Sequence, residues 1–312
     1  MPKLVNFGCG QLIRSDWVNL DIDPRDPSVL PADFRHPLPF DSGTVDAIYH
    51  SHVLEHLDRD DAKTFLKENA RVLKPGGVLR VVVPDLEVVV THYLDALKGI
   101  ERGEPEAANL AEWARLDLLD QMVRRTWGGK MIEFLKSIDF DNNQRLSQRL
   151  TLEMKANLKL IRTPTATRKR LTLSKIRKGL AWVAVHLLAG REAAQAFREG
   201  LFLNSGELHR WMWDRDSLKR AIEEAGLVDI QIRGARDSAI AGFASYELDT
   251  VGDAVRRPGS LFVEGRKPSG SAATTIRRDT LVGQPKPFGR GAALVEDVDR
   301  HAAARVPIAS NP

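Results

Sequence analysis

The feature that most constrains this chain is a pair of short apolar segments near its N-terminus. Residues 4–10 read LVNFGCG, an apolar run that ends in a Gly-Cys-Gly turn. Residues 17–24 read WVNLDIDP, a second apolar run that ends on the acids Asp21 and Asp23. Glycines at the end of a strand let the backbone approach a ligand closely, and a carboxylate after the next strand can bind ribose hydroxyls. The pair predicts a nucleoside-binding pocket at the carboxyl ends of a parallel sheet.

Composition limits the class of protein. With 312 residues, 43% of them hydrophobic, the chain is long enough for one elaborated domain or two small ones with a sizeable core. Cys9 is the only cysteine, which rules out an internal disulfide and fits a reducing compartment. No N-terminal signal pattern is evident and no apolar run approaches 18 residues. These observations predict a cytoplasmic protein.

The net charge of +4 is unevenly distributed along the chain. Residues 139–199 carry 13 Lys and Arg against 5 Asp and Glu, and residues 266–312 carry 8 against 4. Such blocks are most often solvated surface. No recognised nucleic-acid-binding module accompanies the charge, so no nucleic-acid partner is expected.

The first 87 residues alternate short apolar runs with turn signals, which is typical of an open α/β sheet. A helix is predicted from about Arg59 to Lys74, where Pro-Gly-Gly stops it. The gap between Gly10 and Trp17 is short for a crossover between parallel strands, so any helix there has one or two turns at most. The predicted strands are Leu4–Phe7, Val18–Asp21, Val45–His50 and Val78–Val83.

Beyond residue 87 the pattern changes twice. Residues 88–205 are mostly helical in pattern and too long for a loop, which predicts an inserted helical subdomain. A helix capped by Asp216 and closed by Gly226 then returns the chain to the sheet. Two more strands, expected to form an antiparallel pair, follow at 227–233 and 260–264. From about Pro268 the chain is rich in Ser, Gly, Ala, Pro and Arg, which predicts a disordered tail.

Six segments together resemble the class I S-adenosylmethionine-dependent methyltransferases, with a type 11-like domain of the group found in glycan and polysaccharide biosynthesis. Their order and spacing agree over about half of the chain, at residues 3–87 and about 205–266. The segments are VNFGCG, WVNLDIDP, ADFRHPLPF, DAIYHSHVLEHL, ARVLKPGGVLRVVVPDLE and HRWMWDRDSLKRAIEEAGL.

The resemblance implies a Rossmann-like, seven-stranded, mostly parallel sheet with helices on both faces and S-adenosylmethionine as cofactor. The methyltransferase domain would comprise 1–87 and 205–266, the helical insertion 88–204 would bind the acceptor or form a lid, and 267–312 would be the tail. The implied cofactor-binding residues are Gly8, Cys9 and Gly10 under the methionine and ribose, Asp21 or its competitor Asp23 on the ribose, Asp33 and Phe34 at the adenine, and Ser51 and His52 near the sulfonium.

Methyl transfer to a sugar hydroxyl gains from a general base. The candidates, in order of preference, are His52, Asp85 and His56, although Asp85 is nearly as well explained as a helix N-cap. Cys9 lacks a neighbouring base and is better explained as a small buried side chain than as a reactive thiol.

Several alternatives are weaker. A dinucleotide fingerprint would need a third glycine where Ile13 lies, which disfavours NAD. His52 and His56 form no HExxH motif, so no metal site is expected. His209, Trp211 and Trp213 form a cluster that is equally compatible with sugar stacking and with core packing. The Trp-Gly-Gly-Lys segment at 127–130 is compatible with a lid hinge or with an ordinary helix break.

The expected acceptor is a small molecule or glycan that is methylated on oxygen. Rival functions are methylation of a protein, a nitrogen or a small metabolite, and a non-catalytic binding module in glycan assembly. Residues 162–190 join a basic run to an apolar run too short to span a bilayer. Peripheral membrane contact, a substrate-facing patch and a docked surface helix all fit this segment. The sequence does not define an oligomeric state.

Overall fold

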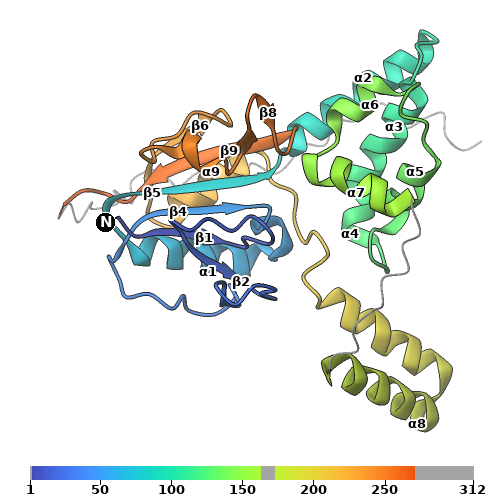
Figure 1. Ribbon diagram of the computed structural model, residues 1–312, viewed down its shortest axis with the longest axis horizontal. Helices are drawn as coiled ribbons and strands as arrows, with labels where there is room; N and C mark the ends of the chain where they lie inside the picture. The colour runs from blue at the N-terminus through green and yellow to red at the C-terminus, as the bar shows by residue number, and fades with distance from the viewer. Residues whose placement is uncertain (1, 163–172, 271–312) are drawn as a thin grey trace, which may run out of the picture. The chain divides into compact units, whose positions relative to one another are not determined.

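The computed structural model describes residues 2–162 and 173–270. Its central element is a seven-stranded sheet with the order β3-β2-β1-β4-β5-β9-β6 (Figure 1). The strands are β1 (Leu4–Phe7), β2 (Val18–Asp21), β3 (Leu30–Pro31), β4 (Val45–Ser51), β5 (Leu73–Pro84), β6 (Val228–Arg233) and β9 (Ser260–Arg266).

The strand directions confirm the predicted mostly parallel sheet. β1 pairs in parallel with β2 and β4, and β4 pairs in parallel with β5. β9 runs antiparallel to both β5 and β6, which confirms the predicted late antiparallel pair. β5 begins earlier than predicted, at Leu73, because the Pro-Gly-Gly segment continues the strand. Gly77 is required there, since an added Cβ would lie 3.0 Å from the carbonyl oxygen of Asp46.

The crossover from β1 to β2 contains no helix, because residues 8–17 form turns. Two buried asparagines hold these turns in place. Asn6 donates to the carbonyl of Leu12 at 3.0 Å and to Asn19 Oδ1 at 3.2 Å. Asn19 in turn donates to the carbonyl of Arg14 at 2.8 Å. These side-chain bonds satisfy buried backbone groups that a crossover helix would satisfy internally.

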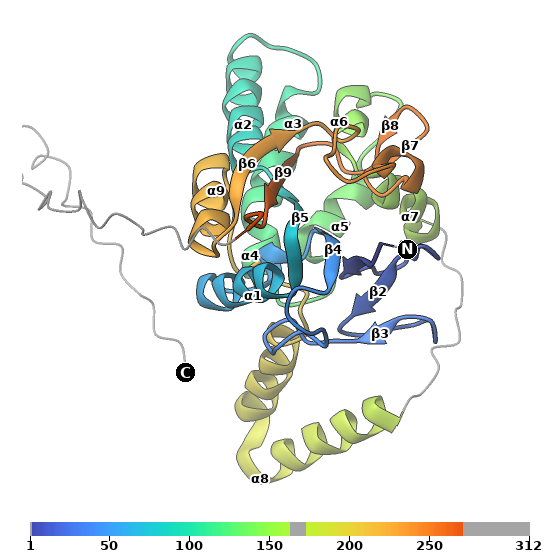
Figure 2. The same cartoon turned by 90° about the vertical axis from the view of Figure 1, so that its left-hand side faces the viewer.

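One face of the sheet is covered by α1 (Arg59–Val72) and α9 (Arg215–Glu224), which lie side by side (Figure 2). Asp58 caps α1 by accepting from the backbone N–H groups of Asp60 and Asp61. α9 is capped by Asp214 and not by the predicted Asp216, because Asp214 accepts from the N–H groups at 216 and 217 in a capping box.

The other face of the sheet is covered by a segment that the sequence patterns did not predict. The 3₁₀ helix η3 (Phe243–Tyr246) and the loops around it pack against Tyr49, Val82 and Phe262. A two-stranded hairpin, β7 (Thr250–Val251) with β8 (Ala254–Val255), follows η3. The buried side chains of this face form a second core that is separate from the one under α1 and α9.

The described part of the predicted insertion consists mostly of helices joined by short loops. It has a hydrophobic core of its own, built around Leu110, Trp113, Met131, Leu135 and Leu146. The helices are α2 (Leu86–Glu101), α3 (Ala107–Arg115), the π-helix η2 (Leu116–Asp120), α4 (Gln121–Val123), α5 (Gly129–Ser137), α6 (Gln144–Arg149), α7 (Leu152–Arg162) and α8 (Leu173–Leu203).

The segment 162–190 is only partly described, since residues 163–172 lie outside the described residues. α8 is interrupted at Gly190, which has non-helical backbone angles. Leu187 and Leu188 are exposed by 76% and 89%. Within the two described stretches, no helix is both long and apolar enough to cross a bilayer. The predicted membrane contact therefore stays a prediction.

Lys267 is hydrogen-bonded to β5 just beyond the end of β9. Its carbonyl accepts from the N–H of Gly76 at 2.8 Å, and its own N–H donates to the carbonyl of Gly77 at 3.0 Å. The predicted division of the chain into domains stays a prediction. The predicted disorder from 271 onward lies outside the described residues.

Candidate active site

A cavity of about 1400 Å³ opens at the carboxyl ends of β1, β2, β4 and β5. The sheet contributes the glycine turn after β1, Asp21, His52, Pro84 and Ser260 to its lining. The helical insertion contributes further lining residues from α2, α3 and α6, among them Trp113. This is the position where open α/β sheets bind their ligands.

The glycine turn presents backbone to this cavity. Gly8 and Gly10 have φ values of +64° and +53°, which glycine adopts without steric cost. The N–H groups of Gly8 and Cys9 donate to the carbonyl of Leu20, at 2.8 and 3.2 Å, and so join the turn to β2. Gly8 and Gly10 both line the cavity. A ligand can therefore approach this turn without meeting a side chain.

The structure distinguishes between the two acids after β2. Asp21 lines the cavity, whereas Asp23 is exposed and lies outside the lining. Asp21 accepts from the N–H of Gly10 at 2.8 Å and from the N–H of Asp23 at 3.0 Å. A carboxylate offers about four lone-pair positions. Asp21 therefore keeps capacity for a ligand diol while its orientation is fixed.

The residues expected at the adenine also line the cavity. Asp33 is bound to Arg35 by two side-chain hydrogen bonds, of 2.9 and 2.6 Å. The pKa of Asp33 falls to about 2, chiefly through its hydrogen bond with Arg35. Phe34 is buried and stacks on Phe65 with ring centroids 5.2 Å apart, so much of its surface belongs to the core.

Three predicted cofactor residues do not line the cavity. They are Asp23, described above, Cys9 and Ser51. Cys9 is buried, and desolvation, assisted by the negative charge of Asp21, raises its thiol pKa to about 11. The structure therefore supports an inert, space-filling thiol at this position.

His52 directly follows β4 and lines the cavity. It has a left-handed backbone, with φ +56°, which is strained for a residue that carries a Cβ. Its Nδ1 lies 3.1 Å from Oε1 of Glu55, and its Nε2 lies 3.0 Å from Oγ of Ser260. Burial, and next to it the charge of Arg257, lowers the pKa of His52. The ring is therefore held between two polar partners.

The other catalytic candidates differ in position. His56 lines the cavity, and its Nδ1 lies 3.1 Å from the carbonyl oxygen of Leu208. Asp85 does not line the cavity and is the N-cap of α2, where it accepts from the N–H of Glu87 at 3.0 Å. Of the two explanations that the sequence left open for Asp85, the structure shows the helix cap.

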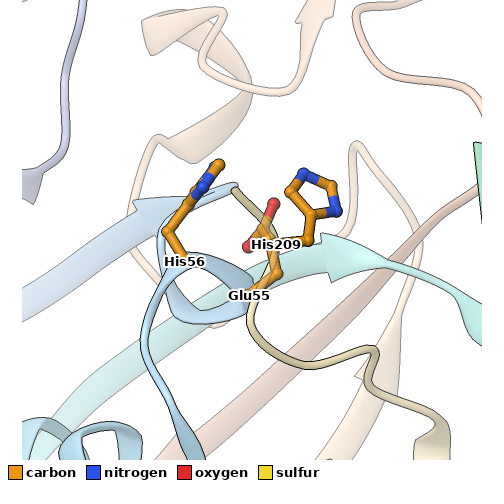
Figure 3. A group of neighbouring side chains, drawn as sticks. All are labelled: Glu55, His56 and His209. Carbon is orange, nitrogen blue, oxygen red and sulfur yellow. The ribbon is translucent and has the colours of Figure 1, made fainter. Parts of the chain in front are cut away.

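A buried cluster that the sequence patterns did not predict joins these residues. The 3₁₀ helix η1 (Leu54–His56) brings Glu55 and His56 beside His209, which comes from the segment before α9 (Figure 3). Donor atoms of the three side chains lie within 4.8 Å of one another. Burial of His209 lowers its pKa to about 3, so its imidazole is neutral at pH 7. His50, in contrast, packs against Phe65 in the core.

The sequence left the tryptophans before α9 open between sugar stacking and core packing. Trp213 is part of the core, and Trp211 packs under the guanidinium of Arg59, 4.7 Å from the ring centroid. The tryptophans that line the cavity are Trp113 and Trp127, both from the insertion. Trp127 is 71% exposed and precedes Gly128, where α5 begins after a break in the helix. The proposed lid hinge stays a prediction.

Two arginines in the lining were not singled out by the sequence patterns. Arg149 ends α6 in the basic block, and its Nη1 is buried without a hydrogen-bond partner. Arg257 precedes β9 and lies close enough to His52 to influence its pKa. Only the fold could show that they share a cavity with the glycine turn.

Comparison with known proteins finds one family match to part of the chain and distant structural likenesses. Residues 13–81 match the methyltransferase domain family. A SAM-dependent methyltransferase from Archaeoglobus fulgidus is 10% identical in sequence to this chain, with a TM-score of 0.36. The alignment covers 85% of this chain and 86% of the Archaeoglobus chain. A chain from the complex between the Haloferax volcanii Trm112 methyltransferase activator and its methyltransferase partner is 16% identical to this chain. The alignment covers 86% of this chain and 83% of the Haloferax chain, with a TM-score of 0.34. A search of curated proteins gives no match.

A third solved structure is Haemonchus contortus phosphoethanolamine N-methyltransferase 2 with S-adenosyl-L-methionine. It is 9% identical, with coverages of 86% of this chain and 49% of its own and a TM-score of 0.33. Likenesses this distant carry no argument about the acceptor. The family match over residues 13–81, the sheet order and the glycine turn with the carboxylate of Asp21 beside it support an S-adenosylmethionine-dependent methyltransferase. Its cofactor is S-adenosylmethionine.

Proposed function

We propose that this methyltransferase transfers the methyl group of S-adenosylmethionine to a hydroxyl oxygen of a sugar or glycan acceptor. The observation that carries the proposal is the composition of a single cavity. Its lining includes the glycine turn and Asp21 together with His52, His56 and His209. An electrophilic cofactor and a polar acceptor can therefore meet within one cavity.

The cofactor side holds S-adenosylmethionine through backbone and carboxylate groups. Gly8 and Gly10 allow close approach of the methionine and ribose, and Asp21 accepts hydrogen bonds from the ribose hydroxyls. Asp33 and Phe34 border the adenine end. The bound cofactor supplies a methyl group on a sulfonium, which is already a strong electrophile. The protein therefore acts mainly by alignment, which can contribute about 7–11 kcal/mol.

The acceptor side supplies a proton acceptor. The carboxylate of Glu55 lies beside Nδ1 of His52, which leaves Nε2 directed at Ser260 Oγ and available to an acceptor hydroxyl. We assign Nε2 of His52 as the group that receives the hydroxyl proton. The insertion, through Trp113 and Arg149, would bind the rest of the acceptor. Aromatic faces beside polar groups suit the alternating apolar and hydroxylated faces of a sugar.

Release of S-adenosylhomocysteine tests this function on a panel of acceptors. The panel contains neutral oligosaccharides, nucleotide sugars, a mixed peptide library and small amines. We expect turnover with a hydroxylated sugar, and a loss of about 10²- to 10⁴-fold in kcat for His52→Gln with unchanged S-adenosylmethionine binding. Asp85→Asn is the matched control, because asparagine also caps helices and kcat should persist. Turnover confined to peptides or amines would contradict the sugar acceptor.

A further inference from the structure

We propose that Glu55, His56 and His209 bind a divalent transition-metal ion, and that zinc is the best match to this ligand set. One carboxylate and two imidazoles form a known zinc-binding combination. Their donor atoms lie within 4.8 Å of one another, and Figure 3 shows the carboxylate of Glu55 between the two rings. Small side-chain rotations would bring three such donors to a common ion.

Two polar atoms of this cluster lack partners. The side chain of Glu55 is 0% exposed; its Oε1 lies 3.1 Å from Nδ1 of His52, whereas its Oε2 has no hydrogen-bond partner. Nδ1 of His209 is likewise buried without a partner, in a residue that is 5% exposed. Unsatisfied buried carboxylates are costly and rare. The neighbouring guanidinium of Arg124 does not compensate the charge, because it pairs with Glu207 at 2.7 Å.

The ring of His56 has the orientation of a metal ligand. Its Nδ1 lies 3.1 Å from the carbonyl oxygen of Leu208. A carbonyl can only accept a hydrogen bond, so Nδ1 carries the proton and Nε2 keeps its lone pair. Metal-bound histidines commonly donate their second ring N–H to a carbonyl in this way, which fixes the tautomer and the ring direction.

The backbone holds the two parts of the cluster together. The carbonyl of Glu55 accepts from the N–H groups of Arg210 at 2.6 Å and Trp211 at 3.2 Å. The N–H of His209 donates to the carbonyl of Gln121 at 3.0 Å. These bonds fix the segment before α9 against η1. The three ligands are therefore positioned by backbone contacts before any ion binds.

Three protein ligands leave a fourth coordination position open, as in catalytic zinc sites. His56 and His209 both line the cavity, so this position is accessible to an acceptor hydroxyl. A zinc ion lowers the pKa of an oxygen bound to it. The hydroxyl proton would pass to Nε2 of His52 while the oxygen attacks the methyl carbon. The carbon–sulfur bond then breaks, and its electron pair stays on sulfur as S-adenosylhomocysteine forms. The catalytic role of the zinc ion rests on the proposed function, whereas the binding of the ion does not.

The sequence predicted no metal site, and the reason is specific. His52 and His56 form no metal-binding motif with each other, and the second imidazole comes from His209, far along the chain. Only the contact between η1 and the segment before α9 brings the three side chains together.

Metal titration of the full chain tests the proposal. The protein is dialysed against a chelator and titrated calorimetrically with Zn²⁺ and, in parallel, with Mg²⁺. We expect one Zn²⁺ per chain, little Mg²⁺ binding, and an unfolding temperature that rises with Zn²⁺. Glu55→Gln and His209→Ala should each weaken Zn²⁺ binding by at least about 10- to 100-fold. His186→Ala is the matched control, because that ring stacks on Trp182 in α8 and should not affect binding.

Three results would overturn the metal site. They are no Zn²⁺ bound by the folded wild-type chain, equal Zn²⁺ affinity in the ligand variants and His186→Ala, and binding of Mg²⁺ in preference to Zn²⁺. Circular dichroism shows whether each variant is folded, and His209→Gln replaces His209→Ala if the latter is not. S-adenosylmethionine binding, measured on the same metal-free protein, tests the proposed function separately.

Discussion

Gly8 packs directly against Val53, so closely that a Cβ on Gly8 would lie 2.3 Å from Cγ2 of Val53. Gly8 also has φ +64°. Gly8→Ala should therefore combine about 1–2 kcal/mol of backbone strain with about 1–3 kcal/mol of steric overlap. Gly10→Ala is the matched control, because its φ is +53° but no atom lies within 4 Å of its added Cβ. Urea unfolding of both variants checks this, and equal losses of stability would contradict it.

Arg80 should contribute strongly to stability. Its guanidinium is 0% exposed and lies 2.8 Å from Asp249 and 2.9 Å from Glu264. Arg80→Met removes the guanidinium that both buried carboxylates contact, although Glu264 keeps Arg233 at 3.4 Å, and this should cost about 3–5 kcal/mol of unfolding free energy. The exposed Arg220–Asp216 pair provides the comparison, and Arg220→Met should cost no more than about 1 kcal/mol. Chemical denaturation measures both, and similar losses in the two variants would refute the role of Arg80.

The elements of the sheet were predictable where local pattern determines them. β1 and β2 have the predicted bounds because an apolar run followed by a turn is sufficient to define a buried strand. The helix-free crossover between them was harder to predict. Its structure depends on Asn6 and Asn19, whose side chains bond to backbone far from their own strands. Single polar residues inside a strand give no periodic signal. Sequence patterns therefore do not reveal that asparagine side chains hold this crossover in place of a helix.

The thiol of Cys9 should be nearly unreactive in the folded protein. Burial, together with the charge of Asp21, raises its pKa to about 11 from 9.0. The thiolate fraction near pH 8 should therefore be about 100-fold lower than in the unfolded chain, and labelling should rise about tenfold per pH unit. Because the chain has a single cysteine, labelling by a disulfide reagent with and without urea measures this directly. Rapid labelling of the folded protein at pH 8 would show that the thiol is accessible and ionised.

The candidate site was predictable on its cofactor side and not on its acceptor side. Gly8, Gly10 and Asp21 follow consecutive strands, so their convergence is a consequence of parallel topology. Trp113, Arg149 and His209 reach the same cavity through tertiary contacts between segments with no common pattern. Trp213 was left open between sugar contact and core packing, and only the fold shows its side chain buried in the core.

The most direct test of the account is a calorimetric titration of S-adenosylmethionine and S-adenosylhomocysteine, with NAD as a negative control. Asp21 lines the cavity and Asp23 does not, so the two asparagine variants form a matched pair. The account predicts micromolar binding of both adenosyl ligands, a loss of about 10- to 100-fold in Asp21→Asn, and wild-type affinity in Asp23→Asn. Absence of binding to the wild-type chain, or equal affinity in Asp21→Asn and wild type, would contradict it.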